Sequence, residues 1–63
     1  MTLKERIEDF ALQKAKQMEI SKTPQAYGAW EKEVLTYINN TTSYTPLEAE
    51  IELSWIIHKN NLY

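Results

Sequence analysis

Apolar residues recur three or four positions apart in three segments of the chain, at about 3–19, 24–38 and 46–60. This spacing places apolar side chains on one side of an α-helix, so the pattern predicts three helices. The predicted fold is all-α, a small three-helix bundle that forms a single domain over residues 1–63. The bundle is either complete by itself or completed by a second chain. The residues expected to form its core are Leu3, Ile7, Phe10, Ala11, Met18, Tyr27, Trp30, Val34, Ile38, Leu53, Ile56 and Ile57.

Threonines mark the expected start of each helix. Two T-x-x-E motifs, which begin at Thr2 and Thr45, are typical of a capping box, where side chains satisfy free backbone N–H groups at the helix start. Thr23 and Thr45 are each followed by proline, which is favoured at the first helical position because its missing N–H costs nothing there. The polar segment 39–44 is rich in residues that favour turns, and we expect it to connect the second and third helices.

The third segment carries two apolar stripes rather than one. Leu47, Ile51, Trp55 and Leu62 fall on one side of the predicted helix, and Ala49, Leu53, Ile56 and Ile57 fall on the opposite side. A surface helix normally has a single apolar stripe. Either this helix is sandwiched between the other two, or one stripe contacts another chain. We expect the contact residues for a partner or a second copy to be Leu47, Ile51, Trp55 and Leu62.

Gly28 interrupts the second helical segment, where glycine costs roughly 1 kcal/mol relative to alanine. It is interpreted either as a site of close approach by another helix or as a tolerated surface glycine.

Composition narrows the chemistry that the chain can perform. The chain has no cysteine and one histidine, so neither disulfides nor a structural zinc site is expected, and no cofactor is predicted. No apolar run approaches the roughly 18 residues that span a bilayer. The charged first ten residues do not resemble a secretory signal, so a cytoplasmic protein without membrane contact is expected.

No catalytic motif is present. Ser54 and His58 are neighbours at helical spacing, but no glycine-rich phosphate loop, nucleophile elbow or metalloprotease motif accompanies them. Glu50 and His58 lie two turns apart with no third ligand, so no metal site is expected. A chain of 63 residues has little room for a pocket of several hundred Å³. We therefore predict that the protein is not an enzyme and has no small-molecule substrate.

Three classes of function stay open. The first is a protein–protein interaction module (an inhibitor, adaptor or regulator), because tryptophan at the centre of an apolar stripe is typical of binding surfaces. The second is a helix-turn-helix nucleic-acid binder, which the net charge of −2 and the acidic start of the third helix disfavour. The third is a self-assembling structural protein, most simply a homodimer. In size and composition the chain resembles phage and mobile-element accessory proteins of bacteria. No sequence motif supports this resemblance.

Overall fold

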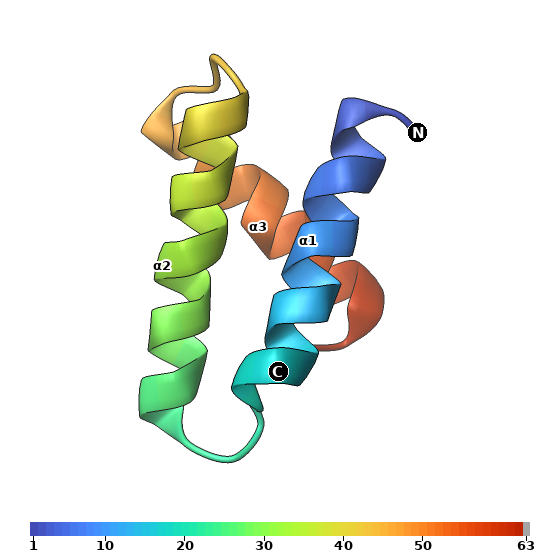
Figure 1. The fold of residues 1–63 in the computed structure, drawn as a ribbon. Coiled ribbons are helices and arrows are strands. Elements are labelled where there is room, and N and C mark those ends of the chain that lie inside the picture. The colour runs from blue at the N-terminus through green and yellow to red at the C-terminus, as the bar shows by residue number, and fades with distance from the viewer. Residues whose placement is uncertain (63) are drawn as a thin grey trace.

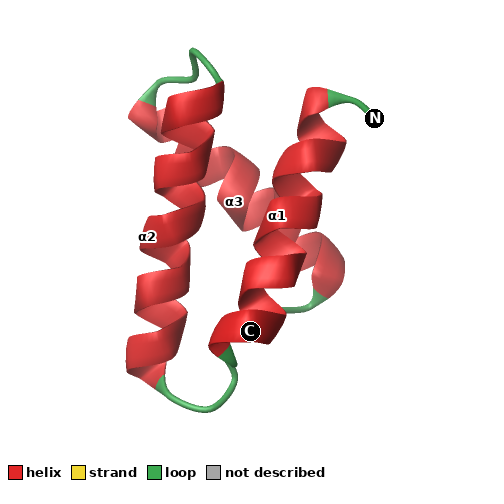
Figure 2. Ribbon diagram, in the orientation of Figure 1, coloured by secondary structure: helices red, strands yellow, loops and turns green. Residues whose placement is uncertain are grey.

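Three helices make up almost all of the computed structural model, which describes residues 1–62: α1 (Leu3–Met18), α2 (Pro24–Thr41) and α3 (Pro46–Asn60). α1 and α2 lie side by side and run in opposite directions, and α3 crosses behind both of them (Figure 1). Short loops join the helices, and the described residues form no strand (Figure 2). The predicted all-α three-helix fold is confirmed.

The threonine caps form as the sequence predicts. In α1 the Thr2 hydroxyl accepts from the Glu5 N–H at 3.2 Å, and the Glu5 carboxylate accepts from the Thr2 N–H at 3.1 Å. Thr45 and Glu48 repeat this reciprocal pair at the start of α3, also at 3.2 and 3.1 Å. Thr23 caps α2 with a single bond. Each cap satisfies backbone donors that the helix itself leaves free, and this fixes where each helix begins.

α1 and α3 both end in a residue with left-handed backbone geometry, Glu19 at φ 50° and Asn61 at φ 58°. After Asn61 the Leu62 N–H donates to the Ile57 carbonyl at 3.0 Å, which is the hydrogen bond of a Schellman motif. The chain therefore turns sharply at Asn61. This turn brings Leu62 back against the core, where it is half-buried, instead of extending the stripe along α3.

α2 is longer than the sequence pattern predicts. It continues past Ile38 to Thr41, so three residues expected in the connecting loop are helical. Near its end the Thr41 hydroxyl donates to the Tyr37 carbonyl, and the Thr42 hydroxyl donates to the Ile38 carbonyl, both at 2.7 Å. Each hydroxyl shares the carbonyl four residues back with a backbone N–H, as at Ile38, which also accepts from the Thr42 N–H at 2.9 Å. Residues 39–41 are therefore helical in spite of their weak helix propensity.

Trp30 is the largest fully buried side chain, and it ties α2 to α1. Its indole N–H donates to the backbone carbonyl of Ala11 at 2.8 Å, so the buried polar atom is satisfied. Ala11 and Ala15 are small residues on the buried side of α1, which leaves room for the large ring. The other buried residues are Ile7, Ile20, Val34, Ile38, Ala49, Leu53 and Ile56.

One expectation about an individual residue is wrong, and the structure decides between the two interpretations of Gly28. Leu3 was expected in the core but is 41% exposed, because it lies in the first turn of α1, at the edge of the bundle. Gly28 is not a site of close helix approach, since a Cβ added there meets no heavy atom within 4 Å. Gly28 is instead an exposed residue on the surface of α2.

Candidate functional site

The outer side of α3 carries three large apolar side chains in solvent. They are spaced four residues apart and are more than half exposed: Leu47 at 67%, Ile51 at 60% and Trp55 at 59%. The opposite side of the same helix is buried in the core through Ala49, Leu53 and Ile56. The sandwiched interpretation is therefore wrong, because nothing in the described chain covers the outer stripe. We call Leu47, Ile51 and Trp55 the α3 stripe.

Leu62 does not belong to this stripe. Its position was predicted by continuing the helical spacing from Trp55, but α3 ends at Asn60. Leu62 packs with the core and borders a hollow that includes Leu12, Ala15 and Ile20. The sequence pattern also placed the helix end at about residue 60, but the stripe was extended beyond that end to Leu62.

Contacts with α1 hold the C-terminal end of α3 in place. The Glu8 carboxylate accepts from the Asn60 amide at 2.9 Å and pairs with the Lys59 ammonium at 3.3 Å. The hydrogen bond from Asn60, together with the nearby Lys59 charge, lowers the pKa of Glu8. The core side of α3 and this polar link together fix the direction in which the α3 stripe faces.

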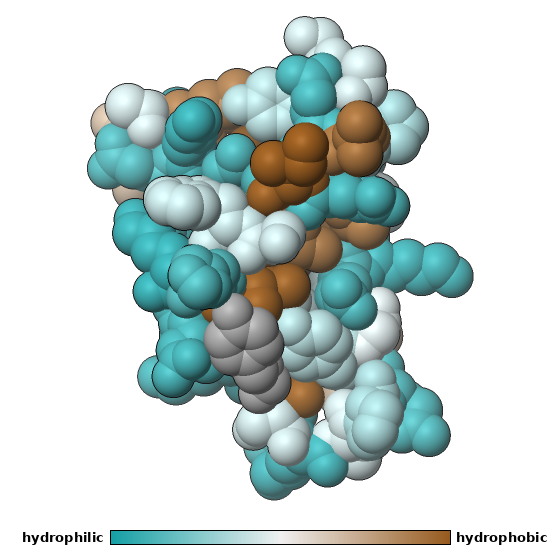
Figure 3. Space-filling model, turned by 180° about the vertical axis from the view of Figure 1, so that it is seen from behind, coloured by the Kyte–Doolittle hydropathy of each residue, from teal (hydrophilic) through white to brown (hydrophobic). Residues whose placement is uncertain are grey.

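A shallow hollow lies beside the stripe, bordered by Ile51, Ser54, Trp55, Ile57 and His58. Four of these residues, at positions 51, 54, 55 and 58, follow the i, i+3, i+4, i+7 spacing of one helix face. Figure 3 shows the face of the molecule on which α3 lies, where brown hydrophobic surface is broken by pale and teal side chains. The sequence interpretation placed Ser54 and His58 on a polar strip and missed that they border this hollow.

Charges are distributed unevenly along the outer side of α3. Glu48 and Glu50 are exposed in its first half, and Glu52 is half-buried. His58 and Lys59 lie in the last turn. The stripe is therefore flanked by carboxylates at its N-terminal end and by basic side chains at its C-terminal end.

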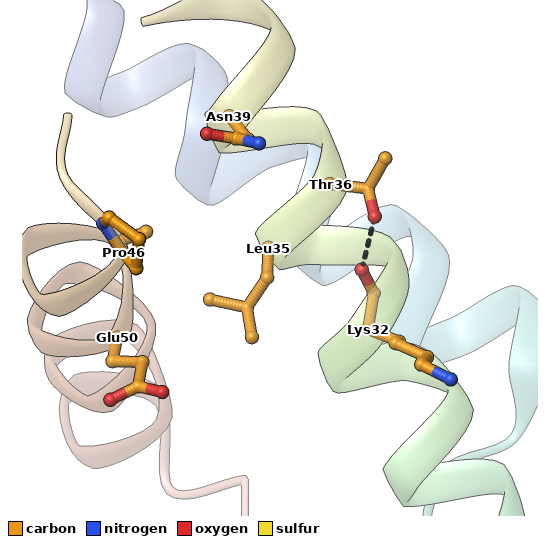
Figure 4. A pocket seen from close by; sticks show the side chains of 7 residues that line it. Lys32, Leu35, Thr36, Asn39, Pro46 and Glu50 are labelled. Atoms are coloured by element: carbon orange, nitrogen blue, oxygen red, sulfur yellow. Dashed lines mark hydrogen bonds between the residues drawn. The ribbon is translucent and has the colours of Figure 1, made fainter. Parts of the chain in front are cut away.

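Another hollow lies between α2 and α3 and has a volume of about 220 Å³ (Figure 4). Leu35 extends from α2 toward this space, and Pro46, Ala49 and Glu50 border it from α3. Small-molecule sites usually occupy roughly 300–1,000 Å³ and hold several convergent polar groups. Lys32, Thr36, Asn39 and Glu50 supply polar groups to this hollow, but its volume is below that range.

The two residues considered for catalysis lie on the surface. Ser54 and His58 are both exposed, whereas nucleophile activation depends on a protected site with an oxyanion stabiliser. No group of three or more histidine, aspartate or glutamate side chains within residues 1–62 is placed to hold a metal ion.

Comparison with known proteins gives no match to this chain among family models, curated proteins or solved structures. Over the described residues, none of the helices combines the length and the apolar character needed to cross a bilayer.

Proposed function

We propose that this protein is a small non-enzymatic protein–protein interaction module, an inhibitor, adaptor or regulator that contacts its partner through the α3 stripe. The observation that carries the proposal is the exposure of Leu47, Ile51 and Trp55 in one row on a helix whose other side is buried. An amphipathic helix that presents anchors at such spacing is a common mode of protein recognition. We include in this proposal a role as a phage accessory protein in the bacterial cytoplasm, which only the size and composition of the chain support.

The energetics favour a binding role for these side chains. Fully burying a large apolar side chain contributes about 1.5–3 kcal/mol, and each residue of the α3 stripe still has more than half of its surface to bury. Tryptophan is among the residues that most often dominate binding energy. α3 is already folded and anchored by Glu8, so little conformational entropy is lost when it binds.

Charge argues against the nucleic-acid alternative. Within residues 1–62, three of the seven cationic side chains lie within 4 Å of a carboxylate: Lys14 with Glu33, Lys22 with Glu19, and Lys59 with Glu8. The exposed side of α3, where a recognition helix would meet the major groove, carries apolar residues and two exposed glutamates, with His58 and Lys59 in the last turn. Phosphates favour arginine and lysine there, and glutamates would repel them.

Site-specific photo-crosslinking tests the proposal. A photoreactive phenylalanine analogue replaces Ile51 in the α3 stripe, and in a matched control it replaces Gln17, which is exposed on α1. We expect a protein crosslink, to this chain or another, from position 51 and not from position 17. Loss of that crosslink with Trp55→Ala, in a chain that still folds by circular dichroism, supports the stripe as the contact. Crosslinks to nucleic acid, or none from position 51, would overturn the proposal.

A further inference from the structure

The α3 stripe and the hollow beside it are complementary to each other. We propose that the partner of the stripe is a second copy of this chain, with the two α3 helices packed antiparallel about a two-fold axis. This inference rests on the proposed function, because it takes the stripe to be a protein contact. It adds the identity of the partner and the geometry of the contact.

The first argument is the shape of the outer face. Residues at i, i+3, i+4 and i+7 of one helix form the hole that receives a side chain from a neighbouring helix. The hollow at Ile51, Ser54, Trp55 and His58 has this spacing and this lining. Ile51 is itself 60% exposed and projects from the same face, so each copy carries both a knob and a hole. Two copies can therefore insert Ile51 into each other's hollow.

The second argument is charge. Ile51 of one copy faces residues 54 and 55 of the other copy. The two-fold axis lies midway between the facing positions, and it therefore passes near residues 52–53. Antiparallel helices place the same flank of each copy side by side, which brings Glu48 within about one turn of the other copy's Lys59. Lys59 is more than half exposed even while it pairs with Glu8. A parallel pairing would instead gather the glutamates of both copies at one end.

The helix dipoles favour the same direction. In the antiparallel pair the positive N-terminal end of each α3 lies near the negative C-terminal end of the other. In a parallel pair like ends lie together. α3 crosses the outside of the α1–α2 layer, and its outer face carries exposed side chains along its length (Figures 1 and 3).

The size of the contact sets the expected affinity. Each of the three stripe residues exposes on the order of 100 Å² of apolar surface. Counted on both copies and with the flanking side chains, the contact reaches roughly 1,000–1,200 Å², the low end for specific interfaces. We expect a reversible dimer with a dissociation constant in the micromolar range.

Light scattering behind a sizing column, from about 1 μM to about 1 mM, is the first test. The mass should rise from the 7.4 kDa of the monomer to twice that value. Ile51→Asp should raise the dissociation constant by about 30-fold or more. Gln17→Asp, which adds the same charge on exposed α1 surface, should leave it unchanged. A monomer at every concentration, or a dimer that Ile51→Asp does not weaken, overturns the inference.

Single-cysteine crosslinking tests the direction of packing, since the chain has no cysteine of its own. Glu48→Cys and Lys59→Cys should be joined by a short bis-maleimide only when the two variants are mixed. In the antiparallel pair two copies of position 48 lie about 14 Å apart along the helix axis. Efficient crosslinking of Glu48→Cys alone indicates parallel packing and overturns the proposed arrangement.

The two proposals fail in different ways. If the chain stays monomeric while position 51 crosslinks to a different protein, the self-association is wrong and the interaction-module function stands. If position 51 crosslinks to no protein and no dimer forms, both proposals are wrong.

Discussion

The two tryptophans differ sharply in environment, and the same substitution at each tests how the fold is held together. Trp30 is 0% exposed and donates to the Ala11 carbonyl at 2.8 Å, whereas Trp55 is 59% exposed. Trp30→Phe removes the hydrogen bond and leaves a cavity where the larger ring was. Trp55→Phe removes only exposed surface. We therefore expect Trp30→Phe to destabilise the fold and Trp55→Phe to have little effect.

The magnitude follows from two losses at Trp30. The hydrogen bond contributes about 1 kcal/mol net, since the Ala11 carbonyl keeps its own bond within α1 and is not left unsatisfied. Replacing the indole with the smaller phenyl ring lowers the free energy of unfolding by about another 1–2 kcal/mol, because less apolar surface is buried and a cavity is left. The sum is about 2–3 kcal/mol, against a total stability of roughly 3–9 kcal/mol for a domain of this size. The exposed Trp55→Phe should stay within about 0.5 kcal/mol of wild type.

Urea and thermal unfolding followed by far-ultraviolet circular dichroism measure both variants. Trp30→Phe should lower Tm by about 10 °C or more, because each kcal/mol corresponds to about 4–8 °C in a small domain. Measurements at a few micromolar and at tenfold dilution separate folding from association. Equal losses at the two positions, or a larger loss at Trp55 at both concentrations, would show that the assignment of Trp30 to the core and Trp55 to the surface is wrong.

Three further predictions concern local features of the fold. Gly28→Ala should raise the free energy of unfolding by about 0.5–1 kcal/mol, since the added Cβ meets no heavy atom within 4 Å. Ala29→Gly, at the next residue on the exposed surface of α2, should lower the free energy of unfolding by a similar amount. Chemical denaturation measures both changes. Thr45→Ala should cost about 1 kcal/mol through loss of the α3 capping box, whereas Ser43→Ala in the preceding loop should cost less than about 0.5 kcal/mol in the same assay. Glu8 has a folded-state pKa below its ordinary value of 4.5. The carboxylate therefore stabilises the fold fully above pH 4.5, and this stabilisation is lost as the pH falls through the folded-state pKa. The destabilisation caused by Glu8→Gln should therefore be larger at pH 7 than at pH 3, and an equal effect at both values would contradict the role given to the Glu8 carboxylate.

Local chemistry in the sequence predicted the starts of the helices well. A threonine cap needs only the residues within one turn of it, so the two capping boxes were visible from their T-x-x-E spacing. The predicted ends of α1 and α3, at about residues 19 and 60, also agree with the structure to within one residue. The end of α2 was placed three residues too early, because the helix continues through residues of weak helix propensity to Thr41. The left-handed residues that follow α1 and α3, Glu19 and Asn61, had no glycine to signal them.

The sequence by itself determined that α3 has two apolar sides, because helical spacing fixes the angle between side chains. Only the tertiary structure decided which side is buried, since that depends on where α1 and α2 pack. The side with Leu53 and Ile56 is buried, and the side with Ile51 and Trp55 faces solvent. Helical spacing also could not place Leu62, because its position depends on a backbone turn beyond the helix end. Periodicity gives direction around a helix axis, whereas burial is a property of the whole packed chain.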